Sequence, residues 1–139
     1  MTDPVLTSAE LDAFLAREFP QVADIFTVVD VRSMGLTLKL TSDQRHLRPG
    51  GTISGPTLFT LADCGVYLAL IAMVGPEALA VTTNGTVDFM RKPEADRALI
   101  AEVELLKLGR SLVVGDVRMR SEGSLATVAR ATMTYSRPK

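Results

Sequence analysis

The sequence has little of what several classes of site require. Its 139 residues include one cysteine, Cys64, and one histidine, His46. A lone cysteine forms no internal disulfide, which argues against a secreted scaffold and favours a reducing cytoplasm. The first residues also lack the basic start and apolar run of a signal peptide. With so few His and Cys ligands, no metal site is expected.

An excess of charge of one sign is also absent. The 15 basic and 16 acidic residues leave a formal net charge of −1. Such a chain produces no strong field toward polyanions, so neither nucleic acid nor an anionic membrane is expected as a partner. The 47% apolar content and the length are typical of one folded soluble domain.

One long apolar run is present, from Gly55 to Gly75, and Asp63 is its single charged residue. The run is long enough to span a membrane, but a central Asp costs about 2.5–3.5 kcal/mol on insertion scales. A helix buried in its own sheet is the better interpretation, with Ser54 as N-cap and Pro56 in the first turn. Because apolar residues lie on all sides, we expect this helix to be covered all round.

The remaining pattern is mostly that of strands. Thr7 and Glu10 form a capping box that predicts a short helix over about 7–18, ended by Pro20. Residues 41–54 are polar and predict a loop. Strands are expected over 25–31, 36–40, 79–90, 99–108, 112–120 and 125–135. The last four, joined by turns, predict an antiparallel meander. The fold class is therefore α+β, a curved antiparallel sheet wrapped around one long central helix.

Asp63 and the start of this helix are the candidate catalytic positions. A carboxylate partly withdrawn from water by apolar neighbours suits a base or a nucleophile. The N–H groups at Gly55 and at residues 57–58 could hold an oxyanion, although glycine there could also serve turn geometry alone. Eight residues separate Gly55 from Asp63, about 12 Å along a helix. If both groups act on one carbonyl, two copies of the helix must contribute to one site.

The run from His46 to Asp63 resembles the signature of PaaI-like hotdog acyl-CoA thioesterases. That signature has an Asn, then His-Gly-Gly, then an Asp eight positions after the first of these glycines. Downstream, Val81-Thr82, Val87 to Pro93, Gly109 to Leu112 and Ala129 to Tyr135 resemble the family's later strands and turns. The resemblance covers about residues 22–136, so we expect an N-terminal helical extension over 1–21 and a hotdog domain over 22–139.

The resemblance implies a homodimer, or a homotetramer built as a dimer of dimers, that hydrolyses acyl-CoA without a metal or cofactor. Gly55 of one subunit would polarise the thioester carbonyl, and Asp63 of the other would activate water or attack directly. Thr82 would help to place the nucleophile. Candidate substrate-binding residues are Arg48, Ser54, Pro56, Arg91, Lys92 and Arg110, the last three near the nucleotide and phosphates of CoA.

The chain departs from the family signature at three positions. Arg48 stands at the family's Asn, Ser54 at its His and Pro56 at its second Gly. Ser54 can cap the helix but cannot act as an imidazole, and Arg48 could pair with Asp63 or bind an anionic group. The alternative function is therefore a non-catalytic acyl-CoA-binding hotdog protein. A hydratase is disfavoured because no histidine lies in or after the helix.

Two further hypotheses are weaker. Cys64 as a nucleophile would need a histidine base, and His46 lies in the preceding loop, so a buried apolar role fits Cys64 better. The segment from Gly50 to Gly55 is not a phosphate-binding loop, because no Lys follows it.

Overall fold

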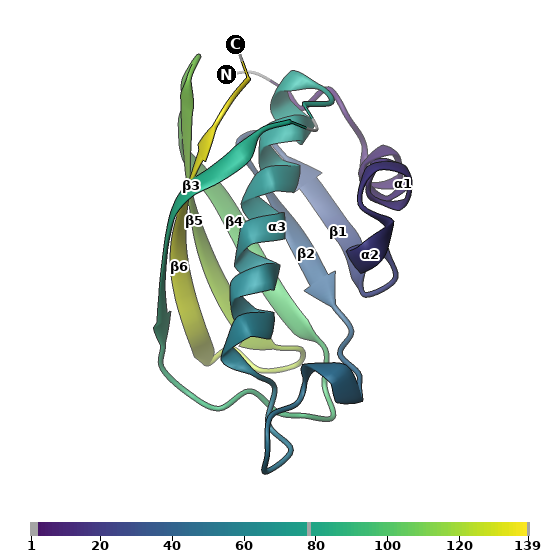
Figure 1. Ribbon diagram of the computed structural model, residues 1–139, viewed down its shortest axis with the longest axis vertical. Helices are drawn as coiled ribbons and strands as arrows, with labels where there is room; N and C mark the ends of the chain where they lie inside the picture. Colours follow the sequence, from purple (N-terminus) through teal and green to yellow (C-terminus); the bar gives the residue numbers. More distant parts are fainter. Residues whose placement is uncertain (1–2, 78, 139) are drawn as a thin grey trace.

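Helix α3, Gly55–Val74, lies at the centre of a six-stranded antiparallel sheet that curves around it (Figure 1). The computed structural model describes residues 3–77 and 79–138. Residues 1, 2 and 139, at the outer ends of the predicted extension and domain, lie outside this range. Within it, the predicted fold class is confirmed.

The N-terminal helix forms as its capping box predicts. Helix α1 spans Ser8–Glu18, and Thr7 and Glu10 exchange side chain to backbone hydrogen bonds at its start. It buries Leu11, Phe14 and Leu15. Pro20 has a second effect that was not predicted: after ending α1 it begins a short helix, α2 (Pro20–Ala23), because proline suits the first turn of a helix. Helix α2 spans the expected boundary between residues 21 and 22.

The six strands lie close to their predicted positions. They are β1 (Phe26–Arg32), β2 (Gly35–Leu40), β3 (Val81–Phe89), β4 (Leu99–Leu108), β5 (Leu112–Ser121) and β6 (Thr127–Ser136). Burial alternates along β5, where Val117 and Met119 are buried while Arg118 is exposed. The alternation turns one face of the sheet toward α3.

The predicted meander of four strands is wrong in one respect. The order across the sheet is β1-β2-β4-β5-β6-β3, so β4, β5 and β6 form a meander but β3 does not join it. Strand β3 pairs with β6, and β4 pairs with β2. The link over residues 90–98 is not a tight turn. It runs from the end of β3 past the N-terminal end of α3 to the start of β4 (Figure 1). Alternation along a strand reports which face is buried, not which strand lies beside it.

Helix α3 packs closely on the sheet through small residues. A Cβ added to Gly65 would lie 2.8 Å from Val103 Cγ2, and one added to Gly115 of β5 would lie 2.6 Å from Val66. Of the most apolar 18-residue window of α3, 78% is buried. The candidate membrane span is therefore the core helix of the sheet.

The expectation that α3 is covered all round is wrong for its N-terminal half. Pro56 and Phe59 are exposed, and Thr60 and Asp63 are only half-buried. This side of the helix faces β3, the edge strand, which is exposed along nearly its whole length. The single chain therefore leaves an open strip beside α3.

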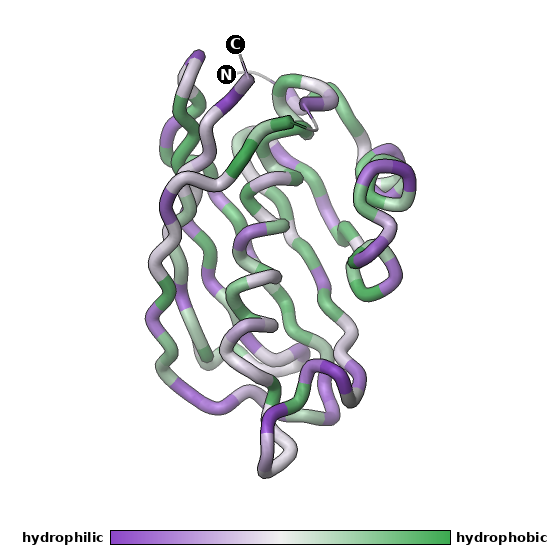
Figure 2. The backbone as a smooth tube through the Cα atoms, in the orientation of Figure 1, coloured by the Kyte–Doolittle hydropathy of each residue, from purple (hydrophilic) through white to green (hydrophobic). Residues whose placement is uncertain are grey.

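Polar connections gather at one end of the molecule. Figure 2 shows mostly hydrophilic segments around the start of α3, in the loop before it and in the link after β3. The core strands and α3 are mostly hydrophobic in the same view. The N-terminus of α3 thus opens toward water, whereas its second half is enclosed.

The close approach at Gly65 predicts an overpacking effect. Gly65→Leu should lower the free energy of unfolding by about 1–3 kcal/mol, because the side chain must displace Val103. Urea denaturation followed by circular dichroism measures the change. Ala16→Leu, on the exposed side of α1, is the control and should change stability by less than about 0.5 kcal/mol. Equal stability of the Gly65→Leu variant and the wild type would contradict the packing.

Candidate active site

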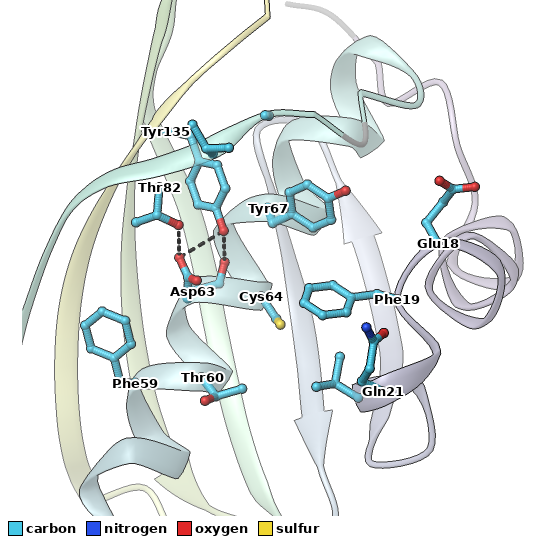
Figure 3. A pocket seen from close by; sticks show the side chains of 13 residues that line it. Glu18, Phe19, Gln21, Phe59, Thr60, Asp63, Cys64, Tyr67, Thr82 and Tyr135 are labelled. Carbon is cyan, nitrogen blue, oxygen red and sulfur yellow. Dashed lines mark hydrogen bonds between the residues drawn. The ribbon is translucent and has the colours of Figure 1, made fainter.

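Asp63 lies midway along α3, where two hydroxyl groups hold its carboxylate. Thr82 Oγ1 donates to Asp63 Oδ1 at 2.6 Å, and Tyr135 Oη lies 2.9 Å from the same oxygen. Tyr135 Oη also lies 3.0 Å from the backbone carbonyl oxygen of Asp63. Figure 3 shows both hydroxyls directed at this one residue. Within residues 3–77 and 79–138, no hydrogen bond reaches Oδ2.

The sheet register places these two hydroxyls together. Thr82 of β3 and Tyr135 of β6 are directly opposed partners. A bulge in β3 follows, between Thr82 and Asn84. Bulges shift the direction of side chains relative to a regular strand and occur often beside functional sites. The pairing of β3 with β6 thus places the two hydroxyls side by side.

A cavity of about 550 Å³ opens beside Asp63. One wall comes from the end of α1 and from α2, and the other from α3, β3 and β6 (Figure 3). Tyr67 and Tyr135 stack within it with ring centroids 5.8 Å apart. Much of the lining is apolar or aromatic, including Phe19 and Phe59. Such a cavity suits an apolar group bonded to the atom that meets the carboxylate.

A second hollow, of about 400 Å³, lies at the N-terminus of α3 and is basic. Gly55 lines it together with Arg48, Arg91 and Lys92. The ring of Phe89 lies 3.4 Å from the position that a Cβ on Gly55 would take. This hollow combines cationic side chains with the positive end of a helix, an arrangement that suits an anion.

The first turn of α3 leaves one donor free. Ser54 caps the helix: its side chain and backbone carbonyl accept from Thr57 N–H, and its carbonyl also accepts from Leu58 N–H. The expectation that residues 57–58 supply oxyanion donors is therefore not met. The Gly55 N–H donates to no group within the described residues.

The structure brings some of the predicted site residues together and separates others. Thr82 meets Asp63, whereas Gly55 faces the other hollow. Arg48 makes no ion pair with Asp63 within the described residues. Arg110 lies at the turn between β4 and β5, at the end of the sheet opposite the start of α3 (Figure 1).

Ser54 and Pro56 line a third hollow, of about 270 Å³. His46 also borders it, and its Nδ1 accepts from Asp43 N–H at 2.9 Å. His46 therefore lies near the start of α3, and it is not among the residues that line the Asp63 cavity. Among the described residues, no three His, Cys, Asp or Glu side chains gather in a way that could hold a metal ion.

Burial and the charge of Asp63 shape the neighbouring groups. Burial, and then the Asp63 charge, raises the pKa of the Cys64 thiol to about 12. The same two causes, in the same order, raise the pKa of Tyr135. Both groups are therefore protonated near neutral pH, which disfavours Cys64 as a nucleophile and keeps Tyr135 a hydrogen-bond donor.

Tyr135 is the site residue that sequence reasoning missed. The alternating pattern of residues 125–135 assigns Tyr135 only to a strand. The sequence nevertheless holds a second indication that its hydroxyl has a role. Ala129, Ala131, Met133 and Tyr135 alternate on the buried face of β6. A tyrosine on such a face needs a partner for its hydroxyl, and Asp63 was the one charge expected in the core.

Comparison with known proteins decides the family. Residues 50–128, more than half of the chain, match the model of the Thioesterase superfamily. The chain belongs to the thioesterase superfamily.

Solved structures agree with this membership. A candidate thioesterase of Silicibacter sp. TM1040 is 51% identical, with a TM-score of 0.91 over 98% of this chain and 94% of that one. A variant of the phenylacetic acid degradation protein PaaI of Thermus thermophilus is 27% identical, with a TM-score of 0.73 over 86% and 99%. The predicted PaaI-like hotdog family is thus confirmed.

A third structure shows the fold alone. A hypothetical thioesterase protein of Streptococcus pneumoniae TIGR4, solved with coenzyme A, is 20% identical, with a TM-score of 0.78 over 91% of this chain and 95% of that one. Together, the superfamily match and the Silicibacter relative support thioesterase activity, which is a hydrolase activity, in this chain.

The raised pKa of Cys64 gives a prediction for its reactivity. At pH 8 a thiol with a pKa of about 12 forms roughly a thousandfold less thiolate than one with its ordinary value of 9.0. Iodoacetamide should therefore label the native protein much more slowly, by about 10-fold or more, than the protein unfolded in urea. Mass spectrometry measures the rate, and Cys64→Ser is the unlabelled control. Rapid labelling of the native protein would contradict this and restore the nucleophile hypothesis.

Proposed function

We propose that this thioesterase-superfamily chain hydrolyses an acyl-CoA thioester to a free acid and CoA, at a site that two copies of the chain share. The observation that supports this most directly is the pair of separate hollows on one helix. One holds a carboxylate beside a cavity with much apolar and aromatic lining, and the other holds the Gly55 N–H among cationic side chains. An acyl-CoA has an apolar part, a reacting carbonyl and an anionic part, which need both kinds of surface.

The exposed edge of the sheet offers a way to join the two hollows. Strand β3 is at the edge and has no neighbour on its outer side within the described sheet. If two copies pair antiparallel along β3, the Phe89 end of one strand lies beside the Val81 end of the other. Because Gly55 lies beside Phe89 and Asp63 beside Thr82, the pairing brings Gly55 of each copy toward Asp63 of its partner.

The proposed reaction uses one residue from each subunit. The Gly55 N–H of one subunit donates to the thioester carbonyl oxygen and stabilises the negative charge that develops there. Asp63 of the other accepts a proton from water while the water oxygen adds to the carbonyl carbon. The C–S bond then breaks, and the CoA sulfur leaves as a thiolate that takes up a proton. In a direct attack, a carboxylate oxygen adds to the carbonyl carbon, the C–S bond breaks and the CoA thiolate leaves and takes up a proton. Water then cleaves the resulting mixed anhydride to the free acid and the Asp63 carboxylate.

The roles of the surrounding residues follow from their positions. Thr82 holds the carboxylate through its hydroxyl. Ser54 and Pro56 border the hollow next to Gly55 and would meet the substrate near its carbonyl. The apolar acyl group would occupy the cavity walled by the N-terminal helices.

The basic hollow would receive the phosphates of CoA. Arg48, Arg91 and Lys92 line it, and guanidinium and ammonium groups suit phosphate oxygens. Antiparallel pairing along β3 would also place Arg110 of the partner subunit at the end of the assembly where this basic hollow lies. The coenzyme A in the Streptococcus pneumoniae structure supports a CoA-linked substrate.

The PaaI-like resemblance adds the expectation of a tetramer. The free buried thiol of Cys64 fits the expected cytoplasmic location.

A panel of acyl-CoA substrates tests the reaction. The wild type should release free thiol from at least one short, medium or aromatic acyl-CoA, and Asp63→Asn should lower kcat by at least about 100-fold because its amide is neither base nor nucleophile. Release is followed with a thiol reagent at matched protein concentrations.

Asp116→Asn is the matched control for this experiment, since it makes the same change on β5 away from the cavity. It should keep full activity. If the wild type and Asp63→Asn show the same background rate while CoA esters still bind, the chain is the non-catalytic acyl-CoA-binding protein that the Ser54 and Arg48 departures suggest.

Mixed dimers test the sharing of the site. Gly55→Asp and Asp63→Asn are each expected to be inactive, but a hybrid of the two has one site with both native residues. Subunit exchange should therefore restore up to about half of the wild-type activity per hybrid dimer. Differently tagged chains, isolated by two affinity steps, make the hybrid measurable. An inactive hybrid of confirmed composition would show that Gly55 and Asp63 do not act on one substrate from different subunits.

A further inference from the structure

Tyr135 holds an unusual place beside the Asp63 carboxylate. Tyr135 is only 4% exposed, and its ring is stacked on that of Tyr67. Its hydroxyl lies within hydrogen-bonding distance of two acceptors on Asp63, the backbone oxygen and Oδ1. A tyrosine used only for packing would need one partner for this hydroxyl. Here the single hydroxyl proton has both acceptors on the same residue, so it is donated to the main chain or to the side chain of Asp63, or shared between them.

The two hydroxyls both contact the same carboxylate oxygen of Asp63. Both Thr82 and Tyr135 approach Oδ1, and neither approaches Oδ2. Since a carboxylate oxygen with two donors has most of its lone-pair capacity occupied, the other oxygen keeps the greater capacity to accept a proton or to attack. Asp63 is half-buried and lines the cavity, and no hydrogen bond within the described residues occupies Oδ2.

We propose that Tyr135 is a positioning residue that, with Thr82, anchors Oδ1 of Asp63 and leaves Oδ2 as the reacting oxygen. This inference rests on the proposed function, because it assigns a role within the same hydrolysis. It adds a residue from β6 to a site that the sequence placed on α3 and β3. Holding the carboxylate in one orientation spares the reaction the cost of ordering it.

The surroundings make Tyr135 a dependable donor. The raised pKa keeps its hydroxyl protonated, because burial and the neighbouring Asp63 charge both disfavour the phenolate. The stacked ring of Tyr67 and the pairing with Thr82 across β3 and β6 fix its direction. The donor is therefore in place before substrate arrives.

Tyr135→Phe tests the role because it keeps the ring and removes only the hydroxyl. We expect kcat to fall roughly 10- to 100-fold, the effect of losing a hydrogen bond to a charged group, while KM changes less than about twofold. Thr82→Val should act in the same direction, and Thr82→Ser, which keeps a hydroxyl, should recover most of the rate. Thr132→Val, on the exposed face of β6, is the matched control and should leave kcat unchanged.

A binding experiment separates positioning from substrate recognition. In the Asp63→Asn background, adding Tyr135→Phe should leave the Kd for an acyl-CoA within about twofold, measured by titration calorimetry. A tenfold weaker Kd would mean that Tyr135 contacts the substrate, and would overturn the inference.

Two outcomes distinguish this inference from the proposed function. If the wild type hydrolyses no acyl-CoA, the proposed function itself fails. If the wild type is active and Tyr135→Phe has the same kcat, Tyr135 does not position Asp63 and only the inference fails. A melting temperature within about 5 °C of the wild type confirms that the Tyr135→Phe variant is folded.

Discussion

The structure depends on one constraint, which is that the Asp63 carboxylate in an apolar helix must find hydrogen-bond donors. Asp63 is the single charged residue of α3, a 20-residue helix that is mostly enclosed by the sheet. A carboxylate in such a place is costly unless hydrogen bonds compensate for lost water. Thr82 and Tyr135 provide them from two strands. The pairing of β3 with β6 therefore does more than close the sheet, since it brings both donors to one oxygen.

The same helix carries the two separate hollows on which the proposed shared site rests. Its first turn, exposed at Gly55 among Arg48, Arg91 and Lys92, suits anions. Its middle, at Asp63, faces an apolar cavity beneath the N-terminal helices. Geometry on a rigid helix keeps these features apart, and the open strip beside β3 is the surface through which a second copy could bring them together. In the proposed dimer, pairing along β3 would cover the open sheet edge and would place Gly55 of one copy near Asp63 of the other.

Substitutions at the family's signature positions fit this division. By the resemblance given above, Ser54 and Pro56 stand at the His and Gly of the PaaI-like signature. The helix begins at Gly55, and the Ser54 side chain accepts from Thr57 N–H. Ser54 therefore caps the helix, but its hydroxyl cannot act as an acid or base in the way an imidazole can. The capping bonds occupy the N–H groups of residues 57 and 58, whereas the Gly55 N–H has no acceptor among residues 3–77 and 79–138. The departure concentrates the proposed oxyanion contact on one backbone group.

The sequence by itself determined the elements, since capping residues, small-residue spacing and alternation report local conformation and which face is buried. It predicted α1, the central helix and six strands, and it singled out Asp63 as the one charge in that helix. The distance along the helix between Gly55 and Asp63 also meant that two copies are needed if both residues act on one carbonyl. Only the tertiary structure decided that β3 crosses to β6, that Tyr135 meets Asp63, and that Arg110 lies far from Arg48 in one chain. These are contacts between residues distant in sequence, and strand pairing is set by the packing of the whole core, which periodicity along one segment does not encode.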